Sequence, residues 1–208
     1  MHPKVLQRLS SQKLLLKTLN GQYSTSQANK NLIHSQYEDV FIPVENVADF
    51  CLSKFEPYSK LPALTCAASG KEFSYEMVKD LAKRFGSQLL VNNLKPGNKI
   101  AVVVPNCPEF GPVLFGSMGV GVTVIPISPM LTPLEISGLF CISEPKLVVT
   151  CDALIPLVQE ALKEQIQKLP IVTISDNSNT DAIPFGQFTA NDGSQQLPRL
   201  EMHEDKCC

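Results

Sequence analysis

The stretch KIAVVVPNCPEF, at residues 99–110, decides the fold class of this chain. A lysine is followed by five apolar residues and then by a polar turn bounded by prolines. This pattern is typical of a strand that lies inside a parallel sheet. Ligands usually bind at the loop after such a strand, but this loop has no glycine that would let backbone amides approach phosphates. The stretch therefore predicts an interior strand, and neither a dinucleotide fingerprint nor a P-loop after it.

Helical segments are predicted on both sides of this strand. Ser74 is expected to cap a helix that reaches about Val91, because its apolar residues recur on one face and its charged residues on the other. Residues 108–121 form an apolar, glycine-containing segment of helix length. The sequence TPLE at 132–135 has the form of a capping box with proline at the first helical position, so a helix begins there. Asp152 is expected to cap a helix that reaches about Gln167.

Short apolar runs separate these helices and complete the fold class. Buried strands are predicted at 100–104, 122–126, 146–150 and 170–174. Strands that alternate with helices form βαβ units, so the chain is predicted to be an α/β protein with a parallel sheet flanked by helices. Residues 176–208 turn polar and loop-like, without a further buried strand. The glycines at 116, 119 and 121 occur before a strand, opposite to a dinucleotide fingerprint, and are expected to let the backbone pack closely on the sheet.

Composition excludes several classes of function. The chain has 208 residues, 44% of them hydrophobic, and a formal net charge of −2. Without a basic patch it is not expected to bind nucleic acid. Its apolar stretches are far shorter than the roughly 18 to 20 residues of a membrane helix, so no membrane span is predicted.

The first 37 residues differ from the rest of the chain. They contain basic residues at 4, 8, 13, 17 and 30 and no acidic residue, and the first acid is Glu38. Leucines lie beside the basic residues at near-helical spacing, and a Ser/Thr-rich segment follows. This composition predicts a mitochondrial transit peptide. The alternative is a disordered leader on a cytoplasmic protein.

Side chains that carry catalysis or bind metals are scarce. The chain has only three histidines, and its seven cysteines form no C-x-x-C pair. It has no G-x-S-x-G elbow, and HEDK at 203–206 is interpreted as a solvated charge run. We therefore assign no catalytic, cofactor-binding or metal-binding residue. These histidines are His2, His34 and His203, and the cysteines are Cys51, Cys66, Cys107, Cys141, Cys151, Cys207 and Cys208.

One weaker candidate site lies at the strand ends. Asn106 and Cys107 follow the strand at 100–104, and Ser128 follows the next strand. Because ligands bind at the carboxyl ends of parallel strands, these residues could line a pocket for a small molecule. An ordinary turn, in which Asn106 satisfies local amides, is the alternative.

The order of motifs resembles a known family. LKPGNKIAVVVPNCPEF, the following G-V-T-V-I-P, the T-x-x-E at 132–135 and PKLVVTCDAL are similar to the N-terminal third of the AMP-forming adenylating enzymes. The acyl- and aryl-CoA synthetases of the 4-coumarate–CoA ligase and luciferase-like branch are the most similar. The resemblance covers about residues 38–175 and implies an incomplete N-terminal subdomain of the adenylating-enzyme fold. One small departure is Val120-Gly121, where the family usually has Ala-Gly.

The resemblance also implies what these residues lack. In the family, the Ser/Thr/Gly-rich loop that wraps the ATP phosphates follows the region that this chain matches, and the catalytic lysine comes later still. Each phosphate contact contributes roughly 1.5 to 3 kcal/mol, whereas micromolar to millimolar binding amounts to only about 4 to 8 kcal/mol. ATP binding by these 208 residues alone is therefore not expected.

We expect a truncated N-terminal fragment of a carboxylic acid–CoA ligase, inactive on its own. The intact relative would use ATP, Mg and CoA on an acid, as in fatty acid metabolism. The alternative is a non-catalytic binding or regulatory module that pairs with a full-length ligase.

Overall fold

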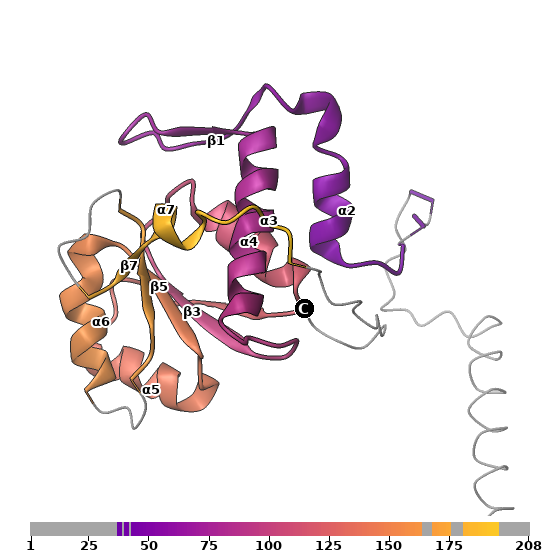
Figure 1. Cartoon of the computed structure of the whole chain (residues 1–208). Helices are drawn as coiled ribbons and strands as arrows, with labels where there is room; N and C mark the ends of the chain where they lie inside the picture. The colour runs from indigo at the N-terminus through magenta and orange to yellow at the C-terminus, as the bar shows by residue number, and fades with distance from the viewer. Residues whose placement is uncertain (1–36, 39, 42, 164–167, 176–180, 196–208) are drawn as a thin grey trace, which may run out of the picture. The chain divides into compact units, whose positions relative to one another are not determined.

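The computed structural model describes residues 37–195 apart from 39, 42, 164–167 and 176–180. The chain divides into two units, Met1–Ile42 and Pro43–Cys208, and the elements described below belong to the second. In the described part of this unit, five strands form one parallel sheet in the order β4-β3-β5-β6-β7. Helices cover both faces of this sheet (Figure 1). The predicted α/β class is confirmed.

The central strands are buried on both faces. β3 (Lys99–Val103) pairs with β4 (Thr123–Pro126) on one side and with β5 (Leu147–Thr150) on the other. Because side chains alternate across a strand, Ile100 and Val102 enter one core while Ala101 and Val103 enter the core on the opposite face. β6 (Ile171–Thr173) extends the sheet beyond β5. β4 was predicted to be buried, but it is only partly buried because it lies at the edge of the sheet among the described residues.

Helices α3 and α4 cover the first face of the sheet. α3 (Tyr75–Val91) begins as predicted, since the Ser74 hydroxyl accepts from the Met77 amide, and Phe85 and Leu89 are fully buried. α4 (Phe110–Gly119) packs tightly on α3, because a Cβ at Gly116 would collide with the Ala82 carbonyl oxygen. The predicted role of the glycines is therefore corrected. Gly116 allows a close approach to α3 and not to the sheet, a Cβ added at Gly119 would meet no atom within 4 Å, and Gly121 (φ 73°) forms a turn.

Helices α5 and α6 cover the second face. α5 (Pro133–Ser143) begins at the predicted capping box, in which the Thr132 hydroxyl and the Glu135 carboxylate bond to each other's backbone amides. α6 (Ile155–Leu162) follows a 3₁₀ turn, η2 (Asp152–Leu154). The prediction that Asp152 caps this helix is wrong. Its carboxylate Oδ1 instead accepts a 2.6 Å hydrogen bond from Thr173 Oγ1, which ties η2 to the end of β6.

A separate antiparallel hairpin precedes α3. β1 (Pro62–Thr65) and β2 (Glu72–Ser74) form a two-stranded sheet. Before it come the short helix α2 (Val47–Ser53) and the 3₁₀ turn η1 (Glu56–Tyr58). Asn46 caps α2 and also donates a 2.9 Å hydrogen bond to the Met118 carbonyl, so α2 is fastened to the end of α4.

The segment after Ser175 is more ordered than predicted. β7 (Ile183–Pro184) adds a short strand beside β6, and α7 (Phe185–Phe188) follows directly. The rings of Phe185 and Phe188 lie 6.0 and 5.1 Å from the Phe85 ring, inside the first core. The loop-like description of residues 176–208 is therefore wrong for 183–188, since two buried aromatic residues hold this stretch against α3.

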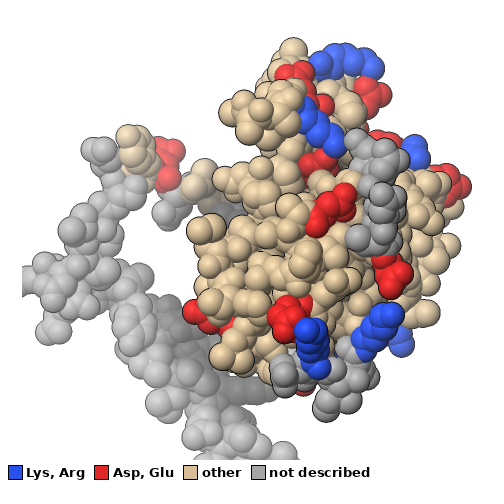
Figure 2. All heavy atoms as spheres, turned by 90° about the vertical axis from the view of Figure 1, so that its left-hand side faces the viewer, with Lys and Arg blue, Asp and Glu red and all other residues tan. Residues whose placement is uncertain are grey.

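Several predictions concern residues outside the described part. The proposed leader, with His2 and His34, lies there except for Tyr37, as do His203, the HEDK run and the two terminal cysteines. Among the described residues, every helix is too short or too polar to cross a bilayer. Figure 2 shows the side on which α6 lies, where charged groups are scattered and of both signs.

Candidate functional site

Hydrogen-bonded side chains hold together the carboxyl ends of the central strands. Thr150, at the end of β5, donates a 2.9 Å hydrogen bond to the Val103 carbonyl at the end of β3. Thr173, at the end of β6, donates to Asp152 as described above. Both threonines are buried. These two hydrogen bonds link β5 to β3 and β6 to the segment after β5, at the edge of the sheet from which the loops after the strands project.

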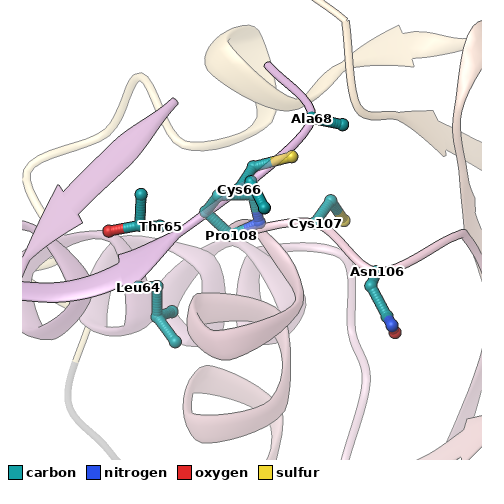
Figure 3. A pocket seen from close by; sticks show the side chains of 8 residues that line it. Leu64, Thr65, Cys66, Ala68, Asn106, Cys107 and Pro108 are labelled. Carbon is teal, nitrogen blue, oxygen red and sulfur yellow. The ribbon is translucent and has the colours of Figure 1, made fainter. Parts of the chain in front are cut away.

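A cavity of about 430 Å³ opens beside the loop after β3. One wall is the end of β1 and the turn after it, and the other is the loop after β3 (Figure 3). Asn106 and Cys107, which were predicted to line a pocket, both line this cavity. Ser128 does not: its hydroxyl accepts from the Met130 amide within its own turn. The lining residues are Leu64, Thr65, Cys66, Ala67, Ala68, Asn106, Cys107 and Pro108.

The hairpin is fastened to this loop by two contacts that the sequence analysis missed. Lys71 Nζ lies 2.6 Å from Glu109 Oε1, and the Glu109 side chain is only 4% exposed. Leu64 packs against Gly111, where an added Cβ would come within 2.5 Å of the leucine Cδ1. A buried carboxylate requires a partner. The glutamate in the apolar stretch CPEFGPVLF could therefore have indicated that a basic residue packs against this loop. Its partner, 38 positions earlier in the chain, could not be identified from local pattern.

The two cysteines of the cavity differ in chemistry. Hydrogen bonds from the Ser69 hydroxyl and from the backbone amides of Ser69 and Ala68 lower the pKa of the Cys66 thiol. Burial, and the negative charge of Glu109, raise the pKa of Cys107 to about 11. Hydrogen bonds to the charged form favour it, whereas burial and a like charge disfavour it. At neutral pH, Cys66 therefore carries more thiolate than Cys107.

This cavity does not fit the phosphates of ATP. Its lining residues include no lysine, arginine or glycine, whereas phosphate sites use cationic side chains and close backbone amides. A cavity of about 300 Å³ between α2, α3 and α4 has Lys79 and Lys83 in its lining, but Lys79 pairs with Glu56 at 3.4 Å. Within the described ranges, no cluster of three His, Cys, Asp or Glu residues could hold a metal ion.

The parallel sheet covered by helices has the fold of the N-terminal domain of adenylating enzymes, and the chain belongs to the AMP-binding enzyme family. The family model matches residues 54–207. A 4-coumarate–CoA ligase from Vanilla planifolia is 25% identical over 178 residues, which are 84% of this chain and 32% of that protein. A probable 4-coumarate–CoA ligase from Dictyostelium discoideum is 23% identical over 207 residues, which are 92% and 36% of the two chains. The chain spans about a third of the length of these curated relatives.

Solved structures share the fold. An anthranilate–CoA ligase in complex with anthranoyl-AMP has a TM-score of 0.68 at 16% identity, over 76% of this chain and 30% of that one. A luciferase-like enzyme from the mealworm Zophobas morio has a TM-score of 0.67 at 15% identity, over 81% and 40%. The resemblance derived from the motifs is therefore confirmed at the level of family and fold.

Proposed function

We propose that this chain forms the N-terminal α/β part of an ATP-dependent, AMP-forming carboxylic acid–CoA ligase and binds no ATP on its own. The family match, over a region that carries the parallel sheet, is the observation that supports this most strongly. The intact ligase would join a carboxylic acid to ATP, forming an acyl-adenylate and releasing pyrophosphate. The acyl group would then pass to the thiol of coenzyme A, with AMP as the leaving group.

The inactivity of the chain by itself is supported by two features. The cavity at the strand ends has no cationic lining. Moreover, the printed sequence contains no Ser/Thr/Gly-rich motif with a lysine of the kind that the resemblance associates with the ATP phosphates. Without a group that compensates the charge of a triphosphate, the described strand edge offers ATP little affinity.

Pyrophosphate exchange into ATP tests this proposal. The purified chain is incubated with ATP, magnesium, labelled pyrophosphate and in turn 4-coumarate, benzoate or a fatty acid. We expect exchange equal to a blank without protein, and exchange above the blank would contradict the inactivity. The protein encoded by the reading frame extended past Cys208 is the matched comparison. We expect it to catalyse exchange with at least one of the acids, and its failure with all of them would contradict the ligase assignment.

We also propose that residues 1–37 direct the chain to mitochondria, on the basis of their basic, acid-free composition. A fusion of these residues to a fluorescent protein should colocalise with a mitochondrial marker. A control fusion carries Arg8→Gln, Lys13→Gln and Lys17→Gln, which remove charge and keep length, and it should remain in the cytoplasm. Cytoplasmic fluorescence of the unchanged fusion would contradict the proposal and favour a leader without a targeting role.

A second candidate is a non-catalytic module that pairs with a full-length ligase. It is favoured by apolar side chains on the outer surface of α5, where Leu134 is 79% and Ile142 is 81% exposed. Exposed apolar groups that lie together are typical of binding surfaces. Co-expression with a full-length ligase and size-exclusion chromatography tests this candidate. Co-elution that is lost in the Leu134→Lys, Ile142→Lys variant supports it, and separate elution contradicts it.

A further inference from the structure

Two thiols line the cavity beside the loop after β3, one on each wall. Cys66 follows directly on the last residue of β1, and Cys107 lies in the loop between β3 and α4. In Figure 3 both side chains border the same opening, with the Cys66 sulfur directed toward the side of Ala68 and the Cys107 sulfur directed away from Cys66. Both residues are partly exposed, so small molecules in solvent can reach the cavity.

The turn after β1 is shaped to stabilise a negative charge on Cys66. The Cys66 amide donates to the Lys71 carbonyl, and the Gly70 amide donates to the Cys66 carbonyl, each at 2.8 Å. Gly70 has a φ of 72°, which closes this turn. In this turn the hydroxyl of Ser69, followed by the amides of Ser69 and Ala68, lowers the pKa of the Cys66 thiol by hydrogen bonding. A thiolate stabilised in this way is the nucleophilic form of cysteine.

The Cys107 thiol, in contrast, is kept in its protonated form. Burial and the carboxylate of Glu109 keep it protonated at neutral pH, as its pKa of about 11 indicates. The same Glu109 binds Lys71 of the hairpin, and Leu64 of β1 packs on Gly111. These contacts hold the hairpin against the end of the loop after β3 and the start of α4. A partly exposed cysteine of lowered pKa that shares a cavity with a second, protonated thiol has the features of a redox-sensing cysteine.

We propose that Cys66 and Cys107 form a peroxide-sensitive thiol pair, in which Cys66 reacts first and Cys107 then closes a disulfide across the cavity. This inference does not depend on the proposed ligase function. It is carried by the shared cavity, the hairpin turn around Cys66 and the contacts that fasten the hairpin to the loop. The ligand class is a small hydroperoxide such as hydrogen peroxide.

The reaction has two balanced steps. The Cys66 thiolate attacks one oxygen of hydrogen peroxide, so that an S–O bond forms, the O–O bond breaks and hydroxide leaves. Cys66 is oxidised by two electrons to a sulfenic acid, while the peroxide is reduced and, after proton uptake, becomes water. The Cys107 sulfur then attacks the Cys66 sulfur, an S–S bond forms, the S–O bond breaks, and the departing hydroxide takes the Cys107 proton as a second water. A disulfide requires the two Cβ atoms to lie roughly 3.5 to 4.5 Å apart, so the bond would join the turn after β1 to the loop after β3.

The experiment uses the reduced full chain and one equivalent of hydrogen peroxide. Remaining thiols are alkylated, the protein is digested without reductant, and cross-linked peptides are identified by mass spectrometry. We expect a peptide pair that joins Cys66 to Cys107. In a Cys107→Ser variant, Cys66 should instead be trapped as the dimedone adduct of its sulfenic acid. Cys141→Ser, on the exposed surface of α5, is the control and should leave the cross-link unchanged.

A second measurement on the wild type does not depend on the folding of any variant. The thiolate fraction falls as the pKa of a thiol rises, so at pH 7 iodoacetamide should label Cys66, whose pKa is lowered, faster than Cys107, whose pKa is raised to about 11. Denaturation in urea should abolish this difference. Equal labelling rates in the native chain, or oxidation that joins Cys107 to Cys151 and leaves Cys66 reduced, would overturn the proposal.

Discussion

The two sides of the central sheet are covered by helices of different character. On one side α3 presents Phe85 and Leu89 to the sheet, while its exposed positions include Glu76, Lys79 and Lys83. On the other side α5 buries Ile136 and Phe140, yet its exposed positions include Leu134 and Ile142. The first helix is amphipathic, and the second is apolar around most of its circumference.

This difference shows what an apolar pattern can and cannot indicate. An amphipathic helix identifies both its buried face and its solvent face, because the charged residues must remain in water. A helix that is apolar all round predicts only that much of it is buried. In α5 the sheet covers one face and leaves the other as apolar surface. Such surface commonly lies against another part of a protein or against a partner.

The largest effects should come from the two buried phenylalanines that anchor these helices. Phe85 and Phe140 are both fully buried, one in each core. We expect Phe85→Ala and Phe140→Ala each to lower the free energy of unfolding by roughly 3 to 5 kcal/mol, because both leave a cavity. Urea denaturation followed by circular dichroism measures the change.

The exposed leucine on α5 is the matched control for this pair. Leu134→Ala should change the free energy of unfolding by less than about 0.5 kcal/mol, since the side chain is mostly in solvent. A Phe140→Ala change as small as this would mean that α5 does not form a core with the sheet in solution. Such a result would contradict the presence of a second packed core between α5 and the sheet.

The close approach of α3 and α4 offers the next largest effect. A Cβ at Gly116 would collide with the Ala82 carbonyl, so Gly116→Ala must push the helices apart and should cost about 1 to 3 kcal/mol. Gly119 lies in the same helix with nothing within 4 Å of an added Cβ. Gly119→Ala should therefore stabilise the chain by roughly 0.5 to 1 kcal/mol. Thermal denaturation should show shifts of opposite sign, and a stabilised Gly116→Ala variant would contradict the close packing.

The caps of α3 and α5 allow a smaller comparison. Thr132→Ala removes the hydroxyl that accepts from the Glu135 amide and donates to its carboxylate at 2.7 Å. Ser74→Ala removes one bond, from the Met77 amide at 3.2 Å. N-cap substitutions cost about 0.5 to 2 kcal/mol, and we expect Thr132→Ala to lie nearer the upper end. Chemical denaturation of both variants measures the loss of stability in each. A larger loss for Ser74→Ala than for Thr132→Ala would contradict the expected order.

Local pattern was sufficient for most of the elements. The apolar run at 100–104 and the cap at Thr132 each depend on residues close together in sequence, so β3 and α5 were predicted correctly. Asp152 was misjudged because its carboxylate binds Thr173, which lies far along the chain. The strand and helix at 183–188 were missed because they are very short, and only the approach of Phe185 and Phe188 to Phe85 holds them.

The candidate site was harder to predict than the fold. Asn106 and Cys107 were identified from their position after a buried strand, and both line the cavity. Cys66, Lys71 and Glu109 were not identified, since their roles arise only when the hairpin packs on the loop after β3. Contacts between segments far apart in sequence leave no periodic signal. A buried charge or thiol can therefore be suspected from the sequence, whereas its partner requires the structure.

The pH dependence of the α5 cap gives the smallest effect. Hydrogen bonds from the Thr132 amide and hydroxyl lower the pKa of Glu135 below its ordinary value of 4.5. Because the folded pKa lies below the unfolded one, the carboxylate stabilises the fold above the unfolded pKa, and this contribution is lost as the pH falls through the folded pKa. Glu135→Gln should therefore be less stable than wild type at pH 7. This difference in stability should disappear as the pH falls below 4.5. Urea denaturation at several pH values measures it. A difference that persists unchanged to pH 3 would mean that the charge does not stabilise the cap.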